Sequence, residues 1–177
     1  MRKIIVSEFV TLDGVIEAPE KWFPQFWSPE LQKFKDEEQF ASGMLLLGRK
    51  TYEIFESAWT SRTGPLADSI NNIQKQIVSK TLKKANWNNS TIIAENFVAE
   101  IIKLKQQEGR DILVVGSNKL VQTLLEENLI DELRLMVSPI ITGSGERLFG
   151  ETKKEKKLRL VETKMFAPNI LLIYQPS

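Results

Sequence analysis

The sequence predicts an α/β fold with a mostly parallel central sheet, flanking helices and antiparallel strands at the C-terminus. Two short apolar runs, 44–47 and 111–115, are typical of parallel strands buried on both faces, and each leads into a glycine and a helical pattern. Two longer strand patterns, 156–166 and 169–175, end the chain and indicate a hairpin. Its 177 residues fit one domain, which we expect to span 1–177.

The other elements follow from local signals along the chain. Ser28 is a good N-cap and Pro29 suits the first position of a helix, so a helix is expected to begin there. In chain order the patterns predict a strand at 2–10, an aromatic loop at 18–29, helices at 29–41 and 49–57, a loop with one helical turn at 58–72, strands at 75–79 and 91–94, helices at 98–108 and 119–128, and a strand at 132–140.

Composition and charge narrow the class of partner. The chain is 42% hydrophobic and 27% charged, with a formal net charge of +1, so no bulk field favours nucleic acid or a membrane surface. The apolar run that opens the sequence is too short for a signal peptide, and no stretch approaches a membrane span of about 18 apolar residues. We therefore expect a cytoplasmic protein that acts on a small molecule.

Two missing residue types limit the chemistry further. Without cysteine there are no thiolate nucleophiles, disulfides or zinc–thiolate sites, and without histidine there are no Ser-His-Asp triads or imidazole bases. Metal sites made of carboxylates alone remain possible, but no motif for one occurs, and we expect no metal. An enzyme of this composition depends on carboxylates, hydroxyls, Lys or Arg, or on a cofactor that carries the reaction.

The first candidate site is the junction that follows strand 44–47. Gly48 allows close backbone approach, and Arg49, Lys50 and Thr51 open the next helix. A helix N-terminus attracts anions, whereas basic side chains destabilise an isolated helix there by a few tenths of a kcal/mol. This arrangement indicates an anionic ligand, although solvated side chains are the alternative interpretation.

A second junction, Gly116-Ser117-Asn118, follows strand 111–115 and offers a flexible turn, a hydroxyl and free helix N–H groups. It suits a pyrophosphate, but it matches neither G-x-G-x-x-G nor a P-loop. Ser79 and Lys80 form a weaker signal at the end of another strand, where a hydroxyl beside a lysine can hold a phosphate. An ordinary strand end explains that pair equally well.

These residues resemble the dihydrofolate reductase fold family, and within it the RibD C-terminal domain family, the reductase domain of bacterial riboflavin biosynthesis. The matching phrases occur in consistent order along nearly the whole chain. They are Thr11-Leu12-Asp13-Gly14, Leu47-Gly48-Arg49-Lys50-Thr51-Tyr52-Glu53, Val78-Ser79-Lys80, Leu113-Val114-Val115-Gly116-Ser117, and Val137-Ser138-Pro139-Ile140 leading into Gly143-Ser144-Gly145. The resemblance implies a dihydrofolate reductase-like three-layer fold and hydride transfer from NADPH.

The resemblance also implies where the cofactor binds. Arg49, with Ser79 and Lys80, would meet the adenosine 2′-phosphate, and Lys50 and Thr51 the pyrophosphate. The residues on the other side of the pyrophosphate would be Gly116, Ser117, Asn118 and Leu120, and those along the nicotinamide would be Thr11, Asp13 and Gly14. The family often has a cis peptide bond in the glycine turn, which here would join Gly116 and Ser117.

Substrate contacts are expected on the helix that begins at Pro29. Its first residues resemble the dihydrofolate reductase helix that carries the substrate-binding carboxylate, so Glu30 falls on that carboxylate and Phe34 on an aromatic wall. Glu30 is also a standard first-turn residue, and Asp13 is the rival catalytic carboxylate. The aromatic residues of the preceding loop would either cover one face of a flat ring or pack in a dimer interface. They are Trp22, Phe23, Phe26 and Trp27.

The sequence therefore predicts an NADPH-dependent reductase, acting on a pyrimidine- or pterin-like ring and resembling 5-amino-6-(5-phosphoribosylamino)uracil reductase. The family tendency is toward homodimers. Two alternatives remain at this point: a dihydrofolate reductase, and a nucleotide-binding dimer module that has lost turnover.

Overall fold

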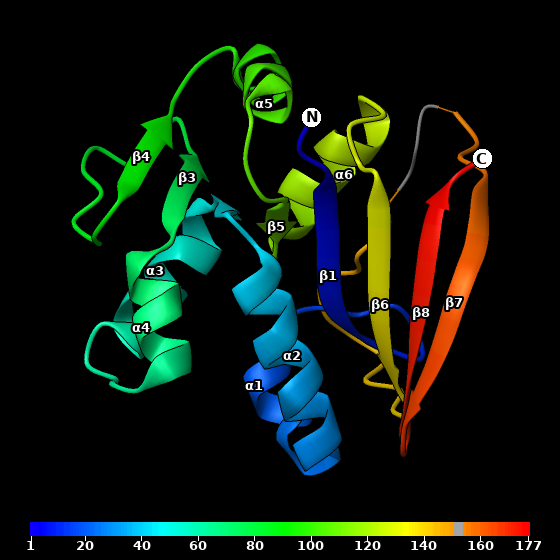
Figure 1. Cartoon of the computed structure of the whole chain (residues 1–177). Helices are drawn as coiled ribbons and strands as arrows, with labels where there is room; N and C mark the ends of the chain where they lie inside the picture. The colour runs from blue at the N-terminus through cyan, green and yellow to red at the C-terminus, as the bar shows by residue number, and fades with distance from the viewer. Residues whose placement is uncertain (151–153) are drawn as a thin grey trace.

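The computed structural model describes residues 1–150 and 154–177, which form an eight-stranded sheet with helices on both faces (Figure 1). The strands are β1 (Ile4–Thr11), β2 (Met44–Gly48), β3 (Gln74–Val78), β4 (Ser90–Ile93), β5 (Ile112–Val114), β6 (Glu132–Ser138), β7 (Leu158–Phe166) and β8 (Asn169–Pro176). The helices are α1 (Pro19–Trp22), a short 3₁₀ turn η1 (Pro24–Phe26), α2 (Pro29–Ala41), α3 (Arg49–Trp59), α4 (Pro65–Asn72), α5 (Phe97–Gln106) and α6 (Asn118–Glu126).

The sheet is parallel except at one edge. Its strand order is β4-β3-β2-β5-β1-β6-β8-β7, and every pairing from β4 to β6 is parallel. The last two strands run antiparallel, to β6 and to each other, and the cis peptide bond between Ala167 and Pro168 lies in the hairpin that joins them. The predicted parallel sheet with an antiparallel C-terminal pair is confirmed.

The apolar strands are buried because helices cover both faces of the sheet (Figure 1). In β2, Met44 and Leu46 pack in the core under α5 and α6, whereas Leu45 and Leu47 pack in the core under α3 and α4. Successive strand side chains point to opposite faces, so a strand covered on both sides has to be apolar throughout. A third core lies under α1 and α2, where Leu31 packs on β6 and β8. The three layers are the sheet and the helices on either side of it (Figure 1).

The structure corrects the expected loop at 58–72. Residues 65–72 form the two-turn helix α4, which begins at Pro65 and buries Ala67 and Ile70. Gly64 precedes it with φ of +108°, a conformation that L side chains rarely adopt.

Among the described residues, no helix is both long and apolar enough to cross a bilayer.

The other elements lie within a few residues of the expected ranges. The aromatic loop at 18–29 contains α1 and η1. The predicted cap at Ser28 is confirmed, because its Oγ accepts the Leu31 N–H at 3.2 Å. This cap begins α2, the helix that covers the site described below.

Candidate functional site

A cavity of about 1090 Å³ lies at the carboxyl ends of the parallel strands, between the sheet and helices α2, α3 and α4. Ser7, Glu8 and Phe9 of β1 line it from the sheet, together with Val115 and Gly116 just past β5. The three helices and the α3–α4 connection supply most of the other walls, and residues 16–20, Trp27, the start of α6 and Glu146 complete them. In open parallel sheets this edge is where ligands bind, because helix N-termini and strand ends converge there.

The two glycine junctions predicted from the sequence meet at this edge. They are neighbours because β2 pairs with β5. A Cβ on Gly48 would lie 2.4 Å from Ser117 Oγ, and a Cβ on Gly116 would lie 2.8 Å from Thr51 Oγ1. Gly116 has φ of +70°, and the Gly116–Ser117 peptide bond is cis, as the resemblance implies. Glycine is thus required at both positions for the two turns to touch.

The helices that start at these junctions have N-termini without a side-chain cap. Neither α3 nor α6 has a capping hydrogen bond or an acidic residue in its first turn, so each leaves N–H groups free to bind an anion. Lys50, Thr51, Ser117 and Asn118, which the resemblance implies as cofactor contacts, line the cavity. Leu120 instead packs into the core beneath α6.

Arg49, Ser79 and Lys80 lie beside this cavity and outside its walls. Gly48 pairs with Val78, so the residues that follow each of them emerge side by side from β2 and β3. The Arg49 guanidinium lies 3.2 Å from Glu53 Oε1, and its side chain is about half exposed. The Ser79 hydroxyl accepts the Thr81 and Leu82 N–H groups, and Lys80 is exposed. Arg49 and Lys80 thus form an exposed basic corner beside the buried Ser79.

Asp13 holds a loop in place. Its carboxylate accepts the Thr11 hydroxyl at 2.6 Å and the Gly143 N–H at 2.9 Å, and the hydrogen bond from Thr11 contributes most to lowering its pKa. Thr11 is itself buried and accepts the Val15 N–H, while Gly14 makes the turn with φ of +86°. Asp13 is thus ionised and ties 142–143 to the end of β1, outside the cavity walls.

The structure does not bring Glu30, Phe34 or Trp22 into the cavity. The α2 residues that line it lie on one face of the helix, and they are Gln32, Lys35, Asp36, Glu38 and Gln39. Glu30 is exposed and off that face. Phe34 packs on Phe166, and Trp22 is buried against Phe23 with its Nε1 donating to the Glu17 carbonyl.

The aromatic walls of the cavity come from other residues. Phe9, Trp27, Phe55 and Trp59 line the cavity. Trp27, one of the loop aromatics considered as a cover for a flat ring, meets the Phe9 ring edge-on at 6.0 Å and donates from Nε1 to Gln32. Flat apolar walls with a few polar groups suit a heterocyclic ring.

Glu8 is a site residue that the sequence reasoning missed. The residue is 8% exposed and is one of those that line the cavity, and its Oε1 accepts the Gly116 N–H at 2.5 Å. Burial raises the pKa of Glu8 to about 7, against the opposing effects of the Gly116 N–H and the Lys35 charge. The available signal was the polar pair Ser7-Glu8 inside an otherwise apolar central strand.

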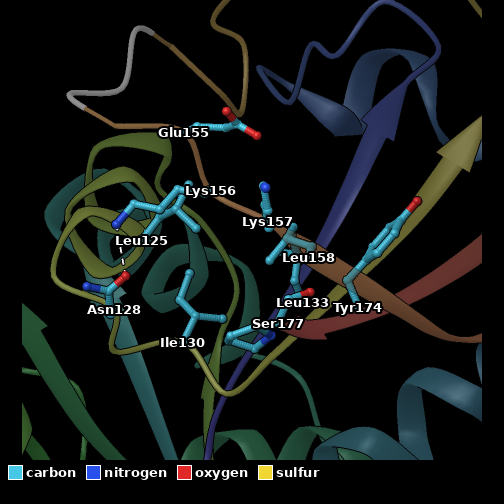
Figure 2. A pocket seen from close by; sticks show the side chains of 11 residues that line it. Leu125, Asn128, Ile130, Leu133, Glu155, Lys156, Lys157, Leu158, Tyr174 and Ser177 are labelled. Atoms are coloured by element: carbon cyan, nitrogen blue, oxygen red, sulfur yellow. Dashed lines mark hydrogen bonds between the residues drawn. The ribbon is translucent and has the colours of Figure 1, made fainter.

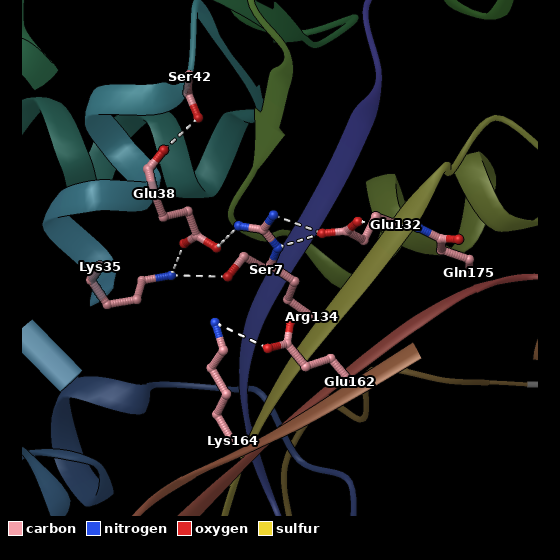
Figure 3. A network of polar contacts seen from close by, with 9 residues as sticks. All are labelled: Ser7, Lys35, Glu38, Ser42, Glu132, Arg134, Glu162, Lys164 and Gln175. Atoms are coloured by element: carbon pink, nitrogen blue, oxygen red, sulfur yellow. Dashed lines mark hydrogen bonds and ion pairs between the residues drawn. The ribbon is translucent and has the colours of Figure 1, made fainter. Parts of the chain in front are cut away.

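A network of charged groups stands next to Glu8 and is drawn in Figure 3. The buried Glu38 forms ion pairs with Lys35 and with Arg134, whose Nη1 lies 3.0 Å from Glu38 Oε1. Lys35 also donates to Ser7 Oγ at 2.9 Å, and Arg134 pairs with Glu132. Burial opposes ionisation of Glu38, but the two cations outweigh it and hold its pKa below the usual value. The network ties α2 to β1 and β6.

A second, smaller cavity of about 350 Å³ lies at the other end of the sheet, where β6 and β7 begin and β8 ends (Figure 2). Leu125 of α6, Leu133 near the start of β6, Leu158 of β7 and Tyr174 of β8 are among its lining residues. None of the site residues predicted from the sequence lines it. Of the predicted site residues, Lys50, Thr51, Gly116, Ser117 and Asn118 line the larger cavity.

Comparison with known proteins identifies a family over nearly the whole chain. A family model described as the RibD C-terminal domain matches residues 2–172. Two Bacillus subtilis (strain 168) proteins, both described as uncharacterized, are similar in sequence. YyaP is 28% identical over 180 residues, covering 97% of this chain and 93% of its own. YwjB is 30% identical over 176 residues, covering 98% and 97%.

Several solved structures share the fold. A putative riboflavin biosynthesis protein from Shewanella sp. PV-4 has a TM-score of 0.81 at 20% identity, with 99% of both chains covered. A Thermotoga maritima deaminase/5-amino-6-(5-phosphoribosylamino)uracil reductase has a TM-score of 0.72 at 16% identity, covering 99% of this chain and 57% of its own. Dihydrofolate reductase from Enterococcus faecalis, complexed with NADP(H), has a TM-score of 0.64 at 17% identity, covering 99% and 96%. The predicted dihydrofolate reductase-like fold is confirmed.

Proposed function

Because the chain belongs to the RibD C-terminal domain family, we propose that it is an NADPH-dependent reductase acting on a pyrimidine- or pterin-like ring. Two of the structural relatives are named as reductases, and one of these was solved with NADP(H). A bound reduced nicotinamide supplies a hydride, and the protein contributes binding, orientation and control of protons.

The observation that carries the proposal is the contact between the two glycine junctions. Gly48 and Gly116 bring two uncapped helix N-termini together beside the cavity, and both helices begin without an acidic residue. Such a pair of N-termini fits the pyrophosphate of a dinucleotide, with Thr51, Ser117 and Asn118 as side-chain donors. A larger side chain at either glycine would close this cradle.

The exposed corner of Arg49 and Lys80, with Ser79 beside it, fits the adenosine 2′-phosphate. It lies at the same sheet edge and outside the cavity, so it suits the end of the dinucleotide remote from the substrate. Arg49 would exchange its exposed ion pair with Glu53 for the phosphate. An exposed pair is worth at most about 1 kcal/mol, so the exchange costs little.

The cavity itself fits the ring substrate. Phe9 and Trp27 on one side and Phe55 and Trp59 from α3 provide flat apolar surface. Gln32, Asp36 and Gln39 of α2, together with Glu8, provide hydrogen-bonding groups for the edge of a heterocycle. These walls hold the ring and exclude water from it.

The test is a titration of NADPH against NADH, followed by tryptophan fluorescence, with wild type and Arg49→Gln. We expect wild type to bind NADPH about 10- to 100-fold more tightly than NADH, the value of hydrogen bonds to a charged group. Arg49→Gln should lose most of that preference. Arg159→Gln, an exposed arginine on the distant strand β7, is the matched control and should retain it.

Equal affinity of wild type for the two cofactors would overturn NADPH dependence, and no affinity for either would overturn the reductase assignment. Turnover is then measured as NADPH oxidation with dihydrofolate and with 5-amino-6-(5-phosphoribosylamino)uracil. Binding of NADPH without oxidation by either acceptor would favour the nucleotide-binding module over the enzyme.

A further inference from the structure

Glu8 stands where the cofactor cradle meets the substrate cavity. It lies on the central strand β1, is buried, lines the cavity and accepts the N–H of Gly116, the glycine of the second junction. A carboxyl group held by this turn lies at the boundary between the two proposed binding regions. Position alone therefore places an ionisable group beside the point of reaction.

The cations near Glu8 are already paired with other groups. Lys35 donates to Ser7 and pairs with Glu38, and Arg134 pairs with Glu38 and Glu132. Within residues 1–150 and 154–177, Glu8 forms no ion pair, and the charged groups that affect it are Lys35 and Glu38 of α2. From the turn after β5 it receives only a backbone N–H. Burial without a paired cation favours the neutral acid.

The other acidic groups at this edge are engaged differently. Asp13 accepts the Thr11 hydroxyl and backbone N–H groups as a carboxylate. Glu17 accepts the Glu146 N–H, and Asp36 accepts from Gln32. Glu38 pairs with two cations. Glu8 is the carboxyl group among these with both burial and a place in the cavity wall but no cation partner.

We propose that Glu8 is the general acid of this cavity and delivers a proton to the heteroatom of the C=N or C=O bond that is reduced. The inference rests on the proposed function and names the residue that completes it. The carbon accepts a hydride supplied by a bound reduced nicotinamide, which is thereby oxidised, as the π bond breaks. The heteroatom takes the proton of Glu8, and the resulting carboxylate is reprotonated from water. A pKa of about 7 keeps a large fraction of Glu8 protonated at neutral pH.

The first test needs no substrate. In protein labelled with ¹³C at the glutamate carboxyls, NMR titration should show one carboxyl with a midpoint near pH 7. That resonance should be absent from Glu8→Gln and present in Glu37→Gln, which removes an exposed carboxylate from the outer face of α2. A Glu8 carboxyl that titrates at the ordinary value of about 4.5 overturns the proposal.

The second test measures NADPH oxidation with the two acceptors named above. Glu8→Gln should lower kcat by about 100-fold or more, the usual contribution of a general acid, while leaving the KM for NADPH unchanged. Wild-type and Glu37→Gln rates should fall about tenfold per pH unit above pH 7, and the residual Glu8→Gln rate should lack that limb. If Glu8 had only a structural role, the rate of Glu8→Gln would show the same pH dependence as that of wild type.

The outcomes separate the two proposals. Wild type that binds no NADPH, or does not oxidise it, overturns the proposed function together with the role of Glu8. Wild type that turns over while Glu8→Gln matches its rate and pH profile overturns the role of Glu8 alone. Loss of the pH limb in Glu30→Gln, with the limb retained in Glu8→Gln, would instead favour the carboxylate expected from the resemblance.

Discussion

Glu8 on β1 and Glu38 on α2 are both buried glutamates that line the same cavity. Their pKa values are nevertheless shifted in opposite directions from that of an ordinary glutamate. Burial raises the pKa of Glu8 to about 7. Burial also opposes ionisation of Glu38, but Lys35 and Arg134 outweigh it, and the pKa of Glu38 is lowered. The two side chains share a chemical group and a degree of burial, so the difference comes from their partners.

The comparison teaches how one cavity can keep a structural carboxylate and a reactive one. Two ion pairs offset the desolvation of Glu38, so this carboxylate remains charged. It also connects α2 to β6 through Arg134 (Figure 3). Glu8 has a single backbone N–H from Gly116, so its neutral form is stabilised instead. Carboxyl groups with separated pKa values are a common arrangement at sites of acid–base chemistry.

The largest effect on this comparison is expected from Glu38→Gln. The change leaves Lys35 and Arg134 without their buried partner, which should lower the free energy of unfolding by about 3–5 kcal/mol at neutral pH. The folded pKa of Glu38 is lowered, so the loss should be present above the unfolded value and shrink as pH falls below it. Urea denaturation measures this, and Glu37→Gln should stay within about 0.5 kcal/mol of wild type. Equal losses in both variants would contradict the ion-pair explanation.

Glu8→Gln should act on stability with the opposite sign. The pKa of Glu8 in the folded protein lies near 7, above the reference value of 4.5. The contribution of Glu8 to the free energy of unfolding is therefore fully present below pH 4.5 and is lost as pH rises through 7. A glutamine accepts the same Gly116 N–H without a charge. Glu8→Gln should therefore match wild type at pH 4 and be more stable by about 3 kcal/mol at pH 8.5. Thermal unfolding at the two pH values measures the difference, and destabilisation of Glu8→Gln at pH 8.5 would contradict the assignment.

The smallest effect should come from Ser7→Ala. It removes one hydrogen bond to Lys35 while leaving the Lys35–Glu38 ion pair intact. The expected loss is about 1 kcal/mol of unfolding free energy by urea denaturation. The ¹³C midpoint of Glu8 should remain near 7 because Lys35 keeps its charge and its partner. A large fall in that midpoint would show that Ser7, and not burial, keeps Glu8 neutral.

Much of the fold was predictable from local pattern. The run 44–47 had to be apolar because helices cover both faces of β2, and Ser28 signalled the start of α2 through its side-chain cap. The segment 65–72 was harder to read because α4 has only two turns and few buried positions. Short helices depend on packing more than on propensity, so their sequence signal is weak.

The candidate site was predictable where glycine was required. Gly48 and Gly116 could be recognised in the sequence because each follows an apolar strand, and in the fold these turns touch. The roles of Glu30 and Phe34 could not be settled in the same way. Which face of α2 meets the cavity depends on how the whole helix sits on the sheet, and that face contains Lys35 and Gln39 instead.

The α/β class, the parallel sheet with its antiparallel edge, and the two glycine junctions could be predicted from the sequence, because they follow from periodicity and from the special backbone freedom of glycine. Which carboxyl has the raised pKa depends on the folded structure. Glu8 meets Gly116 across 108 residues and Glu38 meets Arg134 across 96, so their charge states depend on contacts that no local pattern encodes. Proton affinity is set by burial and by partners, and both are properties of the folded chain.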